Sequence, residues 1–67
     1  MMTVQDFIVS LAYDKGTNTE AIRIHDMDTH ETIEYNVKDV PEKVRRQFVV
    51  SFNLGKDKIY ELIVATV

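Results

Sequence analysis

Two imidazoles and three carboxylates are gathered in one short stretch, and these are the side chains in the chain best suited to bind a metal. The stretch spans residues 25–31 and reads HDMDTHE. Imidazole and carboxylate groups are ligands for zinc and for harder cations. Structural zinc usually needs four convergent ligands, however, and this spacing matches no zinc motif. We therefore expect a solvated polar turn and no metal or other cofactor, with His25, Asp28 and His30 as the weak metal candidates.

Nucleophilic catalysis would depend on Ser10 or Ser51, because the chain has no cysteine. Neither serine lies in a recognisable nucleophile motif or beside a base in the sequence. The two glycines, Gly16 and Gly55, stand far apart, so there is no glycine-rich phosphate loop. A domain this small also rarely offers the pocket of about 300 Å³ or more that a substrate needs. We predict that the protein is not an enzyme and has no catalytic residues.

Lys43, Arg45 and Arg46, with Lys56 and Lys58 further along the chain, form the basic cluster of the sequence. Together with exposed tyrosines, such a cluster can hold a nucleic-acid backbone and stack bases. Acidic residues lie among these bases, and a net charge of −3 is the wrong sign for general nucleic-acid binding. Nucleic-acid binding is therefore kept as the alternative function.

Apolar residues alternate with polar or small ones in several segments, and this period of two predicts strands. The first three predicted strands would form an antiparallel meander, with a hairpin loop at residues 14–19 between the first two. The last predicted strand is apolar on both faces from Leu62 onward, which is typical of a central strand. The predicted strands are residues 7–13, 20–25, 32–37 and 59–67.

A helix is predicted to begin after Asp39, which suits an N-cap position. Pro41 would lie in the first turn, where a missing N–H costs nothing. Glu42 follows the cap by three residues and would complete a capping box.

The end of this helix has two interpretations. If the helix runs to Leu54, Gly55 ends it and the order is strand, strand, strand, helix, strand. If it breaks near Gln47, residues 48–52 form a further strand and residues 55–58 a hairpin loop. We favour the longer helix, because it has both a start and a stop signal.

These elements predict an α+β fold: a small antiparallel sheet of four or five strands with one helix packed on it. A chain of 67 residues has room for one domain, which we place at residues 1–67. Its core is small, and without disulfides a partner subunit is the expected source of extra stability, so we expect a homodimer. No stretch is long and apolar enough to span a bilayer, and the first residues lack a basic signal region, so we expect a cytoplasmic protein.

The expected function is therefore binding of another protein, as a small regulator or inhibitor that acts through a sheet edge or a helix face. The expected interaction residues are the basic side chains of the predicted helix and alternate residues of the last strand: Lys43, Arg45, Arg46, Tyr60, Leu62 and Val64.

Overall fold

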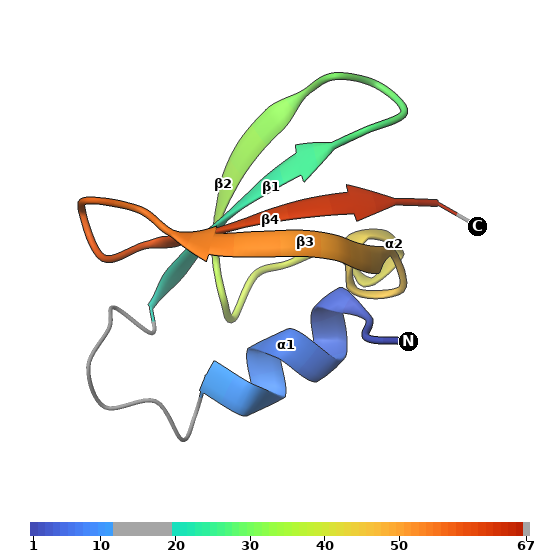
Figure 1. Ribbon diagram of the computed structural model, residues 1–67. Helices are drawn as coiled ribbons and strands as arrows, with labels where there is room; N and C mark the ends of the chain where they lie inside the picture. Colours follow the sequence, from blue (N-terminus) through green and yellow to red (C-terminus); the bar gives the residue numbers. More distant parts are fainter. Residues whose placement is uncertain (12–19, 67) are drawn as a thin grey trace.

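The computed structural model describes residues 1–11 and 20–66 and shows a four-stranded mixed sheet with two short helices (Figure 1). This confirms the predicted α+β class. The predicted hairpin loop at residues 14–19 lies outside the described residues. The elements in chain order are α1 (Val4–Leu11), β1 (Ala21–Asp26), β2 (Thr32–Asn36), α2 (Glu42–Arg45), β3 (Phe48–Leu54) and β4 (Tyr60–Ala65).

The strand order in the sheet is β2-β1-β4-β3, so β1 and β4 are central and β2 and β3 are the edges. The outer pairs, β1 with β2 and β3 with β4, are antiparallel hairpins, whereas β1 and β4 run parallel. The prediction of a central last strand is confirmed. The prediction of a three-stranded antiparallel meander in the first half is wrong for the described residues, because β1 pairs with β2 but Val4–Leu11 is a helix.

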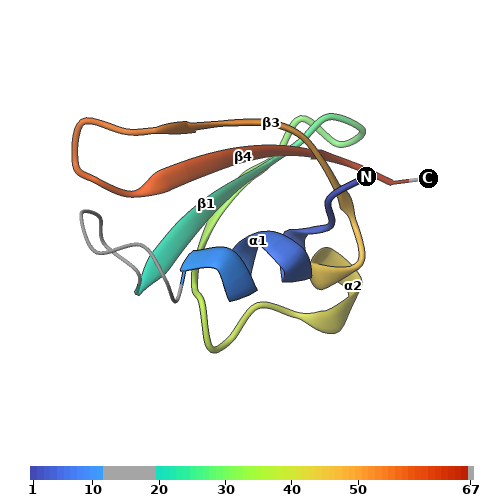
Figure 2. The same cartoon turned by 60° about the horizontal axis from the view of Figure 1, so that its bottom comes forward.

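Both helices lie on the same face of the sheet, and the opposite face is open (Figure 2). The core fills the space between α1 and the two central strands. Because side chains alternate along a strand, Ile22 and Leu62 point into this core while their neighbours point to the open face. The buried apolar residues are Val4, Phe7, Leu11, Ile22, Ile24, Val40, Leu62 and Val64.

Helix α1 replaces the strand predicted for residues 7–13, and the prediction is wrong for its described part. Val4, Phe7 and Leu11 follow a helical spacing and all face the core. A capping box also begins the helix, because the amide of Asp6 donates to Thr3 Oγ1 at 3.2 Å and the amide of Thr3 donates to Asp6 Oδ2 at 3.0 Å. The Thr3 amide holds the pKa of Asp6 below its usual range.

Helix α2 is a single turn, so the favoured long helix is wrong and the shorter alternative is the one observed. Pro41 occupies the N-cap without any side-chain cap hydrogen bond, and the predicted capping box from Asp39 to Glu42 does not form. After Gln47 the chain enters β3, where aromatic and β-branched residues favour a strand. Gly55 then lies in the hairpin turn to β4, where its amide donates to the Ile59 carbonyl at 2.9 Å.

None of the helices in residues 1–11 and 20–66 has the length and apolar character needed to cross a membrane.

Candidate functional site

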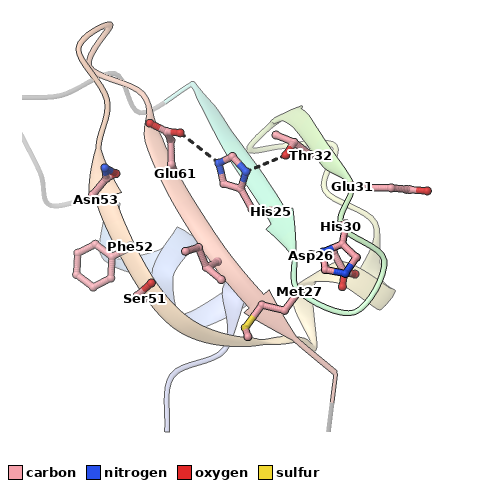
Figure 3. A pocket seen from close by; sticks show the side chains of 11 residues that line it. His25, Asp26, Met27, His30, Glu31, Thr32, Ser51, Phe52, Asn53 and Glu61 are labelled. Carbon is pink, nitrogen blue, oxygen red and sulfur yellow. Dashed lines mark hydrogen bonds and ion pairs between the residues drawn. The ribbon is translucent and has the colours of Figure 1, made fainter.

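A concave site of about 460 Å³ lies on the open face of the sheet, larger than expected for so small a chain (Figure 3). Its base is the row of outward-facing residues from neighbouring strands, and the β1–β2 turn forms one wall. Three carboxylates and no lysine or arginine line it. The lining residues are His25, Asp26, Met27, His30, Glu31, Thr32, Ser51, Phe52, Asn53, Glu61 and Ile63.

His25 on β1 is the central polar side chain of this site. Its Nε2 lies 3.2 Å from Glu61 Oε1 on β4, and its Nδ1 lies 2.8 Å from Thr32 Oγ1 on β2 (Figure 3). A neutral imidazole can donate at one nitrogen and accept at the other, and a charged one can donate at both. Since both nitrogens are already engaged, the ring links three strands.

The β1–β2 turn next to His25 is held together by its own carboxylates. Asp26 Oδ1 accepts the amide of Asp28 at 2.8 Å, and Asp26 Oδ2 accepts from Gln47 Nε2 at 3.0 Å. The hydrogen bond from Gln47, followed by the one from the Asp28 amide, lowers the pKa of Asp26. Asp28 in turn accepts the amide of Thr66 at 3.0 Å through its Oδ2. These carboxylates therefore fasten the turn to the core and to the end of β4.

Of the three metal candidates, the structure brings two to the same cavity. His25 and His30 both line it, and Asp28 does not. Within the described residues, no group of three or more histidine and acidic side chains is placed to hold a metal ion. The turn that carries these residues has a structural role through Asp26 and Asp28.

A second charged network crosses the open face at the other end of β1. Arg23 Nε lies 3.1 Å from Glu34 Oε1 on β2, and its Nη2 pairs with Asp57 Oδ2 in the β3–β4 turn. The hydrogen bond with Asp57 raises the pKa of Arg23, and the guanidinium lowers the pKa of the Asp57 carboxyl. Because all three side chains are partly exposed, this network orders the surface more than it stabilises the fold.

The basic side chains of the predicted cluster have different partners in the structure. Arg45 Nε donates to the Val40 carbonyl at 2.8 Å, its Nη2 donates to the Val37 carbonyl at 3.0 Å, and its Nη1 donates to Gln5 on α1. Arg46 pairs with Glu42 at 2.8 Å on the exposed side of α2. Arg45 therefore has a structural role, because it joins α2 to the preceding loop and to α1. Lys43, Arg45 and Arg46 do not form one free surface.

The predicted interaction residues on β4 point into the molecule. Leu62 and Val64 are fully buried, so they present no surface to a partner in the folded chain. Tyr60 is half-buried and packs edge to face with Phe7 at a centroid distance of 5.1 Å. Phe52 on β3 joins these two rings at 5.0 Å from Phe7, but it is 53% exposed.

The surface that sequence reasoning missed is the outer side of β3 at residues 50–54, called the open β3 edge below. Val50, Phe52 and Leu54 are 57%, 53% and 41% exposed. The sequence FVVSFNL of β3 contains no charged residue, and this was the signal in the chain that pointed to an apolar surface. Which strand lies at an edge was not readable, because strand order is not encoded in a period of two.

The beginning of β3 is covered by the first residues of the chain. The Val4 amide donates to the Gln47 carbonyl at 3.0 Å, and the Val49 amide donates to the Met2 carbonyl at 2.9 Å. Thr3 and Phe48 form an antiparallel bridge between these bonds. No such cover is seen over the open β3 edge within residues 1–11 and 20–66.

The chain was also compared with known proteins, and no family model, curated protein or solved structure matches it.

Proposed function

We propose that the protein is a non-enzymatic protein-binding domain, a small cytoplasmic regulator or inhibitor that binds an extended segment of a partner along the open β3 edge. A strand at the edge of a sheet presents unpaired N–H and C=O groups, and a further strand can pair with them.

The observation that carries this proposal is how little protects this edge. Natural sheets block exposed edges with charged side chains, proline, a β-bulge or a covering segment. Apart from the bulge at Val50, the open β3 edge has none of these in the described structure, and its apolar side chains are about half exposed. The opposite edge differs, because β2 has five residues and carries Glu34. An uncharged apolar edge is favourable only when a partner strand covers it.

The cavity on the open face also supports binding at the open β3 edge. Ser51, Phe52 and Asn53 belong both to the open β3 edge and to the lining of the cavity. A strand added to β3 would direct alternate side chains to the open face, next to this cavity. Main-chain pairing then gives affinity and the cavity gives selectivity among side chains.

Two further features of the proposal have separate support. A homodimer is supported by the small core, since a chain of 67 residues buries a smaller fraction of its surface than a larger domain does. Nucleic-acid binding, the alternative function, has less support because Arg45 is bound to backbone carbonyls and Arg46 is paired with Glu42 on the surface. Lys43 and Arg46 are exposed, but Glu42 offsets the charge of Arg46, and phosphate binding usually needs several free positive charges.

A pool of linear peptides selected for binding to the immobilised protein tests the proposal. We expect the selected peptides to lose binding to a Phe52→Lys variant, because the charge blocks the edge. They should keep binding to Ile33→Lys, a matched change at a residue 44% exposed on the opposite edge strand. Peptides that bind Phe52→Lys as well as the unmodified protein would overturn strand addition at β3.

A further inference from the structure

The direction of the backbone groups on β3 can be worked out from its hairpin. The Gly55 amide donates to the Ile59 carbonyl, and pairs in an antiparallel ladder alternate between hydrogen-bonded and non-hydrogen-bonded. Leu54 opposite Tyr60 and Phe52 opposite Leu62 are thus non-hydrogen-bonded pairs, whose N–H and C=O groups point away from β4.

A bulge and the N-terminal segment limit how many residues of β3 have N–H and C=O groups that point outward and are free. The register shifts between Val49 and Ser51, so Val50 is the extra residue of a bulge. The bulge explains why the Val49 amide also points outward, where it meets the Met2 carbonyl. Phe52 and Leu54 are then the two described residues of β3 that offer free outward amides and carbonyls, one on each side of Asn53.

We propose that a second copy of the chain occupies the open β3 edge, with the two β3 strands antiparallel and the two-fold axis at Asn53. This rests on the proposed function, because it uses the same edge. Phe52 of each copy then lies opposite Leu54 of the other, and each of these two pairs exchanges both of its backbone hydrogen bonds. The outward N–H and C=O groups of Phe52 and Leu54 are all satisfied in this one register.

The side chains on this edge fit a second copy on both faces. Phe52 and Leu54 lie on the helix face, by their pairing with core-facing Leu62 and Tyr60, so the two copies bring apolar groups together there. Asn53 meets Asn53 of the other copy on the open face, where two amide side chains can hydrogen-bond. No charge lies between residues 48 and 54, so no like charges meet although the chain carries a net charge of −3.

The same register avoids the covered part of β3. Gly55 of the second copy lies opposite Ser51, and its chain turns there, before reaching the residues that pair with Met2 and Val4. The result is a closed dimer with one continuous eight-stranded sheet. The cavities of the two copies lie on the same face, on either side of Asn53, and become the two halves of one groove.

Single cysteines test this register, because the natural chain has none and any disulfide must join two copies. The central pair is non-hydrogen-bonded, with Cα atoms about 4.5 Å apart, so Asn53→Cys should oxidise to a covalent dimer. Ser51→Cys is the matched control, since Ser51 is also exposed on the open face. Its Cα atoms in the two copies would be about 14 Å apart, well beyond the limit of about 7 Å for a disulfide.

We expect Asn53→Cys to form a covalent dimer under mild oxidation, and the added change Phe52→Lys to prevent it. Ser51→Cys should stay monomeric on non-reducing gels, with melting curves showing that both variants are folded. Equal cross-linking of both variants, or none for Asn53→Cys, would overturn the register. Light scattering that finds a monomer, together with peptides that still depend on Phe52, would overturn self-pairing and leave strand addition standing. Peptides that bind the Phe52→Lys variant equally well would overturn partner binding at this edge, and the cross-linking result then decides self-pairing independently.

Discussion

The guanidinium of Arg45 donates its Nε hydrogen to the carbonyl oxygen of Val40 at 2.8 Å and so ties the one-turn helix α2 to the loop that precedes it. A second hydrogen bond reaches Val37, and a third reaches Gln5 on α1. One planar side chain thus joins three segments that have few other hydrogen bonds to one another.

Replacing Arg45 by lysine should lower the free energy of unfolding by about 1–3 kcal/mol, although the charge is kept, because a lysine cannot reproduce the planar fork of donors. Urea denaturation measures the change. Lys43→Ala on the same helix turn should stay within about 0.5 kcal/mol of the unmodified protein, because Lys43 is exposed. Equal urea midpoints for Arg45→Lys and Lys43→Ala would contradict the structural role of Arg45.

The carboxylate of Asp26 should make the fold sensitive to acid. Hydrogen bonds from Gln47 and from the turn amides lower its pKa in the folded state. A lowered folded-state pKa gives stability that is present above the ordinary value of about 4 and is lost as the pH falls through the folded-state value. Asp26→Asn should be less stable at pH 7 and should lose less stability between pH 5 and the acid range, as thermal melting would show. A parallel pH dependence for both proteins would contradict this role.

The capping box at the start of α1 should contribute measurably to stability. Thr3→Ala removes the oxygen that accepts the Asp6 amide, and loss of such a cap costs about 0.5–2 kcal/mol. Thr3→Ser keeps the hydroxyl and should restore most of the loss. If alanine and serine at this position gave the same free energy of unfolding, the cap would have no energetic role.

Lys58 in the β3–β4 turn has a φ of 70°, in the left-handed region that favours glycine. Lys58→Gly should therefore raise the free energy of unfolding by up to about 1 kcal/mol, since a side chain in this conformation costs roughly that amount or more. Lys56→Gly in the same turn is the control, because Lys56 has no positive φ and should gain nothing. Thermal melting of the two variants measures the difference, and equal melting temperatures would contradict a strained backbone at Lys58.

The strands β1, β2 and β4 were predictable because each has a clear period of two or a continuous apolar run. Helix α1 was not, because Phe7 and Leu11 satisfy a period of two as well as the helical spacing set by Val4. The capping signal from Thr3 to Asp6 would have favoured the helix, since a strand has no use for it.

The site was predictable only where its residues are neighbours in the sequence. His25 and His30 were expected near one another, but the partner of His25 on β4, Glu61, depends on a parallel pairing of distant strands. The role of Arg45 depends on the carbonyls of Val37 and Val40, which carry no side-chain signal at all. The open β3 edge could be recognised only from the strand order, which places β3 at the edge of the sheet.

The pairing of Met2 with Val49 has a consequence for how the protein stays out of fibrils. An uncharged seven-residue strand is the kind of segment that stacks indefinitely when its whole length is accessible. The N-terminal residues occupy the first part of that length, the bulge at Val50 interrupts it, and a short window remains. That window has room for one short strand. Trimming the first residues would uncover residues 47–49 and lengthen the accessible edge, with the bulge at Val50 left as its interruption.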